Sequence, residues 1–335
     1  MANDQINTHQ DPLVKPARRR LVSAGALAAL AALGGAGMPI RSALAKTALR
    51  GRQVASAHRM KLGQFEVTAL LDGYQDTPLP LLNIDPELLA ILMAEANLPN
   101  APIRIPVNTF LVNTGDRLFL IDSGAARGLG PTMGRLPEVM ASIGVSPADV
   151  DEVLITHAHP DHIGGVLTPE GAALFPNAQL RLARADLAFW ANEENEAKAG
   201  DRKYRFQVAR RAAEAYRARL RPFDPGEQIA PGIQSIGAIG HTLGHTTYQI
   251  ESDGQKLLAI GDTLHIAAVQ FSRPEVTIAY DTDQAQARAA RRALFDRVAR
   301  ENTLIAAAHL PFPGIGRLHR EGASFTFAPI PWQMF

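Results

Sequence analysis

The sequence predicts an α/β fold in a single domain, which extends from residue 59 to the C-terminus. Short apolar or β-branched runs bounded by Gly, Asp or Asn recur along this region, and such runs are typical of strands. Two longer segments instead carry Ala, Arg and Leu at helical spacing. No Pro-, Gly- or Ser-rich linker divides the region, so one domain is the simplest interpretation.

The first half of the predicted domain is rich in strands. We expect a helix over residues 131–143 and strands over residues 65–71, 109–112, 117–122 and 153–156. Asn113-Thr114-Gly115-Asp116 predicts a hairpin turn between the second and third of these strands. The Pro-rich segment 76–106 is interpreted as a long inserted loop, and such loops often shape the entrance of a site.

The second half combines further strands with the two helical segments. The strands are expected over residues 179–183, 233–238, 247–250, 257–260 and 304–308. The spacing of Ala, Arg, Tyr and Leu predicts helices over 202–220 and 284–300. Strands therefore dominate the domain, with helices placed between them.

The first 45 residues are typical of a twin-arginine export signal. Arg18-Arg19-Arg20 precede the apolar stretch 21–40, and Ala43-Leu44-Ala45 has the small-x-small pattern of a cleavage site. The alternative is a membrane anchor, since the apolar stretch is about long enough to span a bilayer, although its Gly and Ala residues make it weakly hydrophobic. Residues 46–58 would then form a flexible arm. The signal predicts a periplasmic or secreted protein that keeps no stable membrane anchor after cleavage.

Charge and composition exclude several classes of protein. The 335 residues carry 34 Lys and Arg, 33 Asp and Glu, and no Cys, which gives a formal charge of +1. Loss of the signal removes five basic and two acidic side chains and leaves −2, so no nucleic-acid partner is expected. The absence of Cys excludes a disulfide scaffold, a zinc ribbon and an iron–sulfur protein. Any metal must therefore be held by nitrogen and oxygen.

The candidate chemistry lies in histidines and aspartates at the ends of predicted strands. His157-Ala158-His159-Pro160-Asp161-His162 follows the apolar run Val153-Leu154-Ile155, and further apolar runs end close to His241, Asp262 and His309. A single such histidine is more often a structural residue. Several strand ends that carry His or Asp instead favour a site for Zn²⁺ or a similar ion, with Mn²⁺, Co²⁺ and Fe²⁺ also compatible with these donors.

These motifs resemble the metallo-β-lactamase superfamily and, within it, the methyl parathion hydrolase group. The H-x-H-x-D-H motif is specific for the superfamily, while Ala267-Ala268-Val269-Gln270-Phe271 and the run HLPFPGIG from His309 to Gly316 narrow the resemblance to the group. The resemblance implies an αββα sandwich, a β-sandwich flanked by helices, as a single catalytic domain. Relatives are often dimers, so it also implies a homodimer.

The resemblance further implies two metal sites. Their ligands would be His157, His159 and His241 at the first site, Asp161, His162 and His309 at the second, and Asp262 as the bridge. His245, in the segment Gly240-His241-Thr242-Leu243-Gly244-His245, is expected behind the ligands, where it can orient one of them. Asp122 would either support the histidine loop or be an ordinary turn carboxylate.

Two divalent ions at such a site would lower the pKa of a shared water, so that a bridging hydroxide exists at neutral pH as the nucleophile. A metal with an open position would polarise the C=O or P=O bond of the substrate. No Ser, Cys or Lys nucleophile is required. Asp161 and Asp262 are therefore expected to take part in catalysis as well as in metal binding.

The substrate pocket is predicted from the same resemblance. Trp190 matches an aromatic residue of the leaving-group pocket of methyl parathion hydrolase, unless it only fills a helix core. Leu129, Phe206, His265 and Tyr280 fall at or near other pocket positions, with Leu129 in place of an aromatic residue and His265 and Tyr280 in place of leucines. The pocket would therefore be more polar than that of the group, and His265 or Tyr280 could give a proton to an alkoxide leaving group.

The sequence therefore predicts a dinuclear metal hydrolase of organophosphate triesters, of the methyl parathion or paraoxon type, that also cleaves aryl esters or lactones. The alternative is a lactonase for acyl-homoserine lactones or other lactones, with only promiscuous activity on phosphotriesters. A β-lactamase is disfavoured because those enzymes usually lack the bridging Asp. The full set of ligands argues against a metal binder without activity.

Overall fold

A computed structural model describes residues 51, 53–125 and 129–334, and the chain from Gln53 onward forms one compact unit. The predicted export signal, residues 1–45, lies outside the described residues. Within the described residues, no helix has both the length and the apolar character that crossing a membrane requires.

The unit is built on two sheets, each of seven described strands arranged in chain order. The first sheet contains β1 (Ala57–Leu62), β2 (Phe65–Thr77), β3 (Ile103–Asn113), β4 (Leu118–Ile121), β5 (Glu152–Leu154), β6 (Gln179–Ala183) and β7 (Leu220–Phe223). The second contains β8 (Gln228–Ala230), β9 (Ile233–Gly237), β10 (Thr246–Ser252), β11 (Gln255–Ala259), β12 (Leu304–Ala306), β13 (Ile315–Glu321) and β14 (Ser324–Pro329). Strands β4 to β7 are parallel, as are β11 and β12, and the other neighbours are antiparallel.

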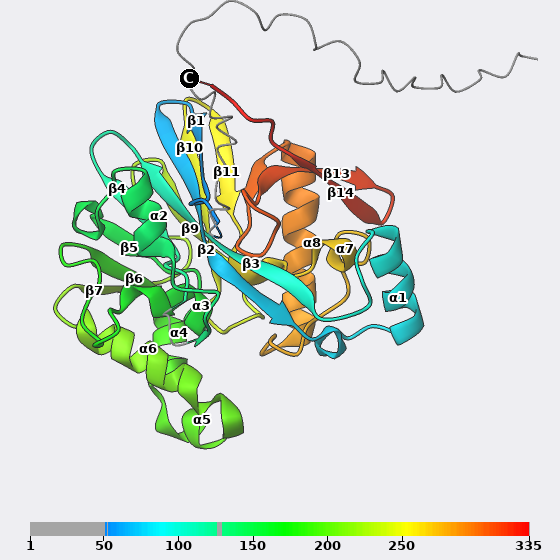
Figure 1. Cartoon of the computed structure of the whole chain (residues 1–335), viewed down its shortest axis with the longest axis horizontal. Helices are drawn as coiled ribbons and strands as arrows, with labels where there is room; N and C mark the ends of the chain where they lie inside the picture. Colours follow the sequence, from blue (N-terminus) through cyan, green and yellow to red (C-terminus); the bar gives the residue numbers. More distant parts are fainter. Residues whose placement is uncertain (1–50, 52, 126–128, 335) are drawn as a thin grey trace, which may run out of the picture. The chain divides into compact units, whose positions relative to one another are not determined.

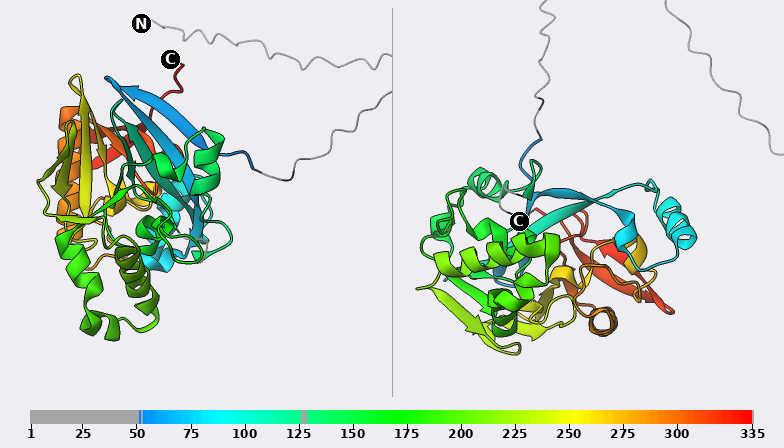
Figure 2. Two further views of the ribbon diagram at one scale, coloured as in Figure 1. Left: turned by 90° about the vertical axis from the view of Figure 1, so that its left-hand side faces the viewer. Right: turned by 90° about the horizontal axis from the view of Figure 1, so that it is seen from below.

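Helices cover the outer faces of the two sheets. On the first sheet lie α2 (Leu136–Ser142), α3 (Pro160–Ile163), α4 (Arg184–Ala191) and α6 (Lys203–Ala215), with α5 (Glu193–Ala197) beyond them. On the second lies α8 (Gln284–Glu301), while α1 (Pro86–Glu95) packs with α7 (Ala267–Gln270). Figure 1 shows the green helices and the orange α8 on opposite sides of the sheets, and Figure 2 shows α1 at the edge far from α6.

The main core lies between the two sheets and explains their pairing. Val67, Phe110 and Phe119 of the first sheet pack in one buried cluster with Tyr248 and Leu257 of the second. Each sheet packs one face against the other sheet and its opposite face against helices, so the layers follow the order helix, sheet, sheet, helix. The αββα sandwich expected from the sequence is therefore confirmed.

Two predictions about chain segments need correction. Segment 76–106, predicted as a loop, contains the end of β2, helix α1 and the start of β3. Its prolines conceal a helix start, because Pro86 occupies the first turn and the Asp85 carboxylate caps it by accepting the N–H groups of Glu87 and Leu88 at 3.0 Å. Strand β1 begins at Ala57, inside the predicted arm 46–58, because it pairs with β2.

The hairpin turn at 113–116 is confirmed. The Thr114 N–H donates to the Arg117 carbonyl at 3.0 Å, and the Asn113 side chain accepts the Gly115 N–H at 2.9 Å. These bonds close the turn that joins β3 to β4.

A side-chain hydrogen bond helps to join the two sheets directly beneath the histidine motif. The buried Tyr248 hydroxyl, on β10, donates to the Ile155 carbonyl at 2.8 Å, just beyond β5. We expect Tyr248→Phe to lower the free energy of unfolding in urea by about 1–3 kcal/mol, because a buried carbonyl loses its partner. Tyr204→Phe, at an exposed position, is the control. Equal unfolding midpoints for both variants would show that the bond does not stabilise the fold.

Candidate metal centre

All seven predicted ligands lie at the ends of strands, on connections that both sheets contribute. Four of them, in the stretch 157–162, follow β5, and one lies between β9 and β10: these are His157, His159, Asp161, His162 and His241. Asp262 follows β11 in the 3-10 turn η6 (Gly261–Thr263), and His309 follows β12. Six of the seven are buried, and the Asp161 side chain is 17% exposed. The arrangement places their side chains at one edge of the sandwich.

The first group of donors consists of His157, His159, His241 and Asp262, whose ligand atoms lie within 4.8 Å of one another. The His159 Nδ1 atom is 2.9 Å from the Nε2 atoms of both His157 and His241. The Asp262 Oδ2 atom is 3.1 Å from His241 Nε2 and 3.5 Å from His157 Nε2. Three imidazoles and one carboxylate oxygen therefore converge on one point.

The second group consists of Asp161, His162 and His309. The Asp161 Oδ2 atom is 3.6 Å from the Nε2 atoms of His162 and His309. The other oxygen of Asp262, Oδ1, is 3.0 Å from His162 Nε2 and 3.1 Å from His309 Nε2. The two oxygens of Asp262 therefore face different groups, as a carboxylate that bridges two ions must.

The donors fit two divalent cations. His162 Nε2 and Asp262 Oδ1 are buried and have no hydrogen-bond partner, although they face each other. Buried polar atoms without partners are costly, and cations between these donors would satisfy them. The set consists only of imidazole nitrogens and carboxylate oxygens, which suit Zn²⁺ and related ions.

Asp122 supports the histidine loop, which decides between the two roles considered for it. Its Oδ1 accepts the Thr156 N–H at 2.8 Å, and its Oδ2 accepts the Thr156 hydroxyl and His162 Nδ1–H at 2.8 Å each. Because Nδ1 of His162 donates to Asp122, Nε2 is the ring nitrogen that would bind a cation, after loss of any proton it carries. Asp122 adopts a φ of 54°, a left-handed conformation that Asp tolerates better than most residues.

A buried charge pair stands behind His241. The pair consists of Asp281 and the wholly buried Arg291, whose guanidinium lies 3.8 Å from Asp281 Oδ2. The His241 Nδ1 atom donates to Asp281 Oδ1 at 2.9 Å. Arg291 also donates to the carbonyls of Thr263 at 2.6 Å and Val276 at 2.6 Å. Arg291 therefore joins the segment that carries Asp281 to the turn that carries the bridging carboxylate.

His245 lies behind Asp262, as expected from the sequence. Its Nδ1 donates to the Ala238 carbonyl at 3.0 Å, so that Nε2 accepts the Asp262 backbone N–H at 3.0 Å. Gly261 makes this approach possible, because its φ is +48° and a Cβ there would lie 2.7 Å from His245 Nε2. His245 therefore orients the backbone of the bridging residue.

The sequence interpretation missed two carboxylates that hold the ligand loops. Asp186, wholly buried on α4, accepts the Ala158 N–H at 2.9 Å and the Gly244 N–H at 2.7 Å, and it thereby joins the loops of His157 and His241. Its position just after β6 repeats the pattern of a polar residue after a strand, which could have revealed it. Asp281 lies in an acidic run before α8, where a helix cap is the simpler interpretation.

Four of the five predicted substrate-binding residues form two walls beside the metal centre. Trp190 and Phe206 make an aromatic wall. The Trp190 ring meets the His159 ring edge-on at 5.4 Å between ring centres, and it is tilted against the Phe206 ring at 4.6 Å. His265 and Tyr280 make a polar wall. The His265 Nε2 atom is 3.1 Å from Asp262 Oδ2, and the two rings of this wall are 6.4 Å apart.

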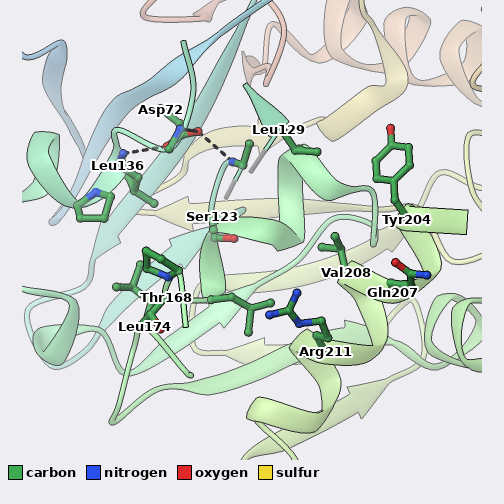
Figure 3. A pocket seen from close by; sticks show the side chains of 16 residues that line it. Asp72, Ser123, Leu129, Leu136, Thr168, Leu174, Tyr204, Gln207, Val208 and Arg211 are labelled. Carbon is green, nitrogen blue, oxygen red and sulfur yellow. Dashed lines mark hydrogen bonds between the residues drawn. The ribbon is translucent and has the colours of Figure 1, made fainter. Parts of the chain in front are cut away.

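One cavity adjoins this region. It has a volume of about 560 Å³ and is lined by His265, His309 and residues of the segment 98–106, so the segment predicted to shape an entrance does line the site. A separate cavity, of about 660 Å³, is lined by Leu129, Tyr204 and Arg211 among others, and none of the predicted metal ligands lines it (Figure 3). Leu129 packs on Val107, Ala125 and Met133, and the structure does not bring it to Trp190.

Loss of the bridging carboxylate tests the two-site geometry. We expect Asp262→Asn to lower the zinc content of reloaded protein below one ion per chain and to lower kcat/KM roughly 100-fold or more, because even loss of an outer partner costs about 10–100-fold. Asp116→Asn, an exposed change, is the control. Two zinc ions per chain in Asp262→Asn would contradict the bridging assignment.

Metal binding should release protons. Burial lowers the pKa values of His162, His241 and His309, but the nearby carboxylates outweigh it and raise all three, that of His241 to about 9. Metal-free protein at pH 7 therefore holds protons that a metal must displace, and zinc affinity should rise with pH toward 9 and fall toward pH 6. Titration calorimetry at pH 7 in buffers of different ionisation enthalpy measures this. Zinc binding without proton release would refute it.

Comparisons with known proteins agree with this geometry. The family model described as metallo-beta-lactamase superfamily matches residues 103–309. The crystal structure of the hydrolase AbOPH superposes on this chain with a TM-score of 0.80 and 33% sequence identity. The match covers 84% of this chain and 100% of the AbOPH chain. A second similar structure is that of AidC, a dizinc quorum-quenching lactonase in complex with a product, N-hexanoyl-L-homoserine. It is 26% identical in sequence, the match covers 84% of this chain and 99% of the AidC chain, and the TM-score is 0.78.

Curated relatives match shorter regions. Lactamase-like protein nscB of Aspergillus fumigatus is 35% identical over 111 residues, which are 33% of this chain and 32% of that protein. The chain spans about a quarter to a third of the length of the curated relatives it matches. The extent of the family match and the two groups of donors lead to one conclusion. The chain belongs to the metallo-beta-lactamase superfamily and is a dinuclear metal-dependent hydrolase.

Proposed function

We propose that this enzyme opens lactones and cleaves related carboxylic esters. The observation that carries the proposal is the polar wall of His265 and Tyr280 beside Asp262. An alkoxide leaving group needs a proton as the C–O bond breaks, and a wall of hydrogen-bonding side chains at the reacting centre can supply one. The similarity to the lactonase AidC supports the same substrate class.

The two residues of the polar wall differ in the proton they can offer. Burial raises the pKa of Tyr280, so its hydroxyl stays protonated at neutral pH and can donate to the leaving oxygen. Burial lowers the pKa of His265, and its imidazole is neutral under the same conditions. We therefore assign the proton donor to Tyr280, and His265 holds a hydrogen bond to the bridging carboxylate.

The remaining side chains bind and orient. Trp190 and Phe206 offer an apolar surface for the acyl or aryl part of the substrate, next to His159. When bound, two divalent ions would lower the pKa of a shared water and polarise the carbonyl oxygen. Burial raises the pKa of Asp262, but the surrounding histidines outweigh it and hold that pKa well below its usual range, so the bridge is ionised.

Organophosphate triesters are the second candidate substrate class. The edge-on contact of Trp190 with His159 favours it, because a flat aryl leaving group could stack at this position. A phenolate with electron-withdrawing substituents departs without a proton, so this reaction does not require a proton from Tyr280.

That difference provides the test. We expect zinc-loaded enzyme to cleave N-hexanoyl-homoserine lactone or dihydrocoumarin with a higher kcat/KM than methyl paraoxon. Tyr280→Phe should lower kcat for the lactones by about 100-fold, in the range of a lost general acid, and leave kcat for methyl paraoxon within about threefold. Tyr204→Phe, at an exposed neighbouring tyrosine, is the matched control.

Three results would contradict the proposal. Equal losses on lactone and phosphotriester in Tyr280→Phe would remove the proton-donor role. A higher kcat/KM on methyl paraoxon than on every lactone would favour the second candidate. Dominant turnover of nitrocefin would exclude both.

A further inference from the structure

Arg205 lies at the junction of the two walls of the site. It is on the first turn of α6, next to Phe206 of the aromatic wall. Its guanidinium carbon is 5.2 Å from the ring centre of Tyr280, on the polar wall, and 6.0 Å from that of Tyr204. The side chain therefore reaches from the helix across to the segment that carries Tyr280.

The charge of Arg205 has no anionic partner within the described part of the chain. None of the described carboxylates forms an ion pair with it, and its Nε atom is buried without a hydrogen-bond partner. Arg210, one turn further along the same helix, is instead paired with Glu196. A half-buried cation that lacks both a counter-ion and a partner for its Nε atom is unusual, because desolvation of charge is costly.

The positive charge lies near the metal centre. The Arg205 guanidinium carbon is 5.2 Å from the ring centre of Tyr280, and that ring is 6.4 Å from the ring of His265. The His265 Nε2 atom is 3.1 Å from Asp262 Oδ2. Two divalent ions near Asp161 and Asp262 would leave this region with still more positive charge. An anion is the ligand that would compensate both the ions and Arg205.

We propose that Arg205 forms an anion subsite at the active site, which binds a carboxylate group that the substrate carries a few carbon atoms from the bond that is cleaved. The inference rests on the proposed function and narrows its substrate class to carboxylate-bearing esters and lactones. The planar guanidinium suits a carboxylate, which it can bind through two parallel hydrogen bonds. The spacing supports a short linker. The ring centres of His265 and Tyr280 are 6.4 Å apart, and the Arg205 guanidinium carbon is 5.2 Å from the ring centre of Tyr280.

A pair of esters that differ only in charge tests the subsite by kinetics. We compare mono-4-nitrophenyl glutarate, which carries a carboxylate, with neutral 4-nitrophenyl pentanoate on the zinc-loaded enzyme. Arg205→Met should lower kcat/KM for the anionic ester about 10- to 100-fold, mainly through KM, and change that for the neutral ester by less than threefold. Arg205→Lys should recover part of the loss. Arg211→Met, at an exposed arginine of the same helix, is the control.

A binding measurement separates this inference from the proposed function. Glutarate and pentanoate each have one carboxylate for the metals, but only glutarate has a second for Arg205. The unmodified enzyme should bind glutarate at least tenfold more tightly, measured by tryptophan fluorescence, and Arg205→Met should abolish this preference. Retention of the preference in Arg205→Met, or its absence in the unmodified enzyme, overturns the subsite. Lack of ester turnover with the preference intact overturns only the proposed function.

Discussion

The buried carboxylate of Asp262 faces the Nε2 atoms of five imidazoles, those of His157, His162, His241, His265 and His309, at 3.0–3.5 Å. Such a cluster of donors is unstable in a dry interior unless cations occupy the space between them. The Oδ2 atom of Asp262 faces His157, His241 and His265 and its Oδ1 atom faces His162 and His309, an arrangement that suits a carboxylate between two cation sites. The rest of the site serves to hold that carboxylate and those rings in place.

The αββα fold meets this constraint because each ligand loop follows a buried strand and is anchored from behind. Asp122 and Asp186 hold the histidine loop of the first sheet, while Asp281 and Arg291 hold His241 and the turn of Asp262 on the second. The three aspartates accept the outer N–H groups of the imidazoles or backbone N–H groups around them, whereas Arg291 donates to the Thr263 carbonyl. The substrate would contact the aromatic wall and the polar wall, whose side chains can differ without changing the metal ligands.

The sequence was most informative where a local pattern carries the chemistry. The H-x-H-x-D-H motif and the strand-end positions of His241, Asp262 and His309 predicted a group of residues that the structure brings together. Among the anchors, Asp122 was considered from the sequence and Asp186 shares the strand-end pattern, but Asp281 could not be predicted in this way. It reaches His241 from 40 residues away, and nothing in its surroundings distinguishes it from a helix cap. Helix α1 was missed because its prolines predict a loop, although Pro86 initiates the helix. Leu129 lines the cavity that also contains Tyr204 and Arg211, and its contact with a substrate stays a prediction.

The central claim is that Asp262 separates and joins two cation sites. Anomalous diffraction at the zinc absorption edge, on crystals of the zinc-loaded enzyme, tests it most directly. The account predicts two anomalous peaks, with Oδ2 of Asp262 and three histidines at one, and Oδ1 with Asp161, His162 and His309 at the other. A single peak, or two peaks of which only one is bound by Asp262, would contradict it.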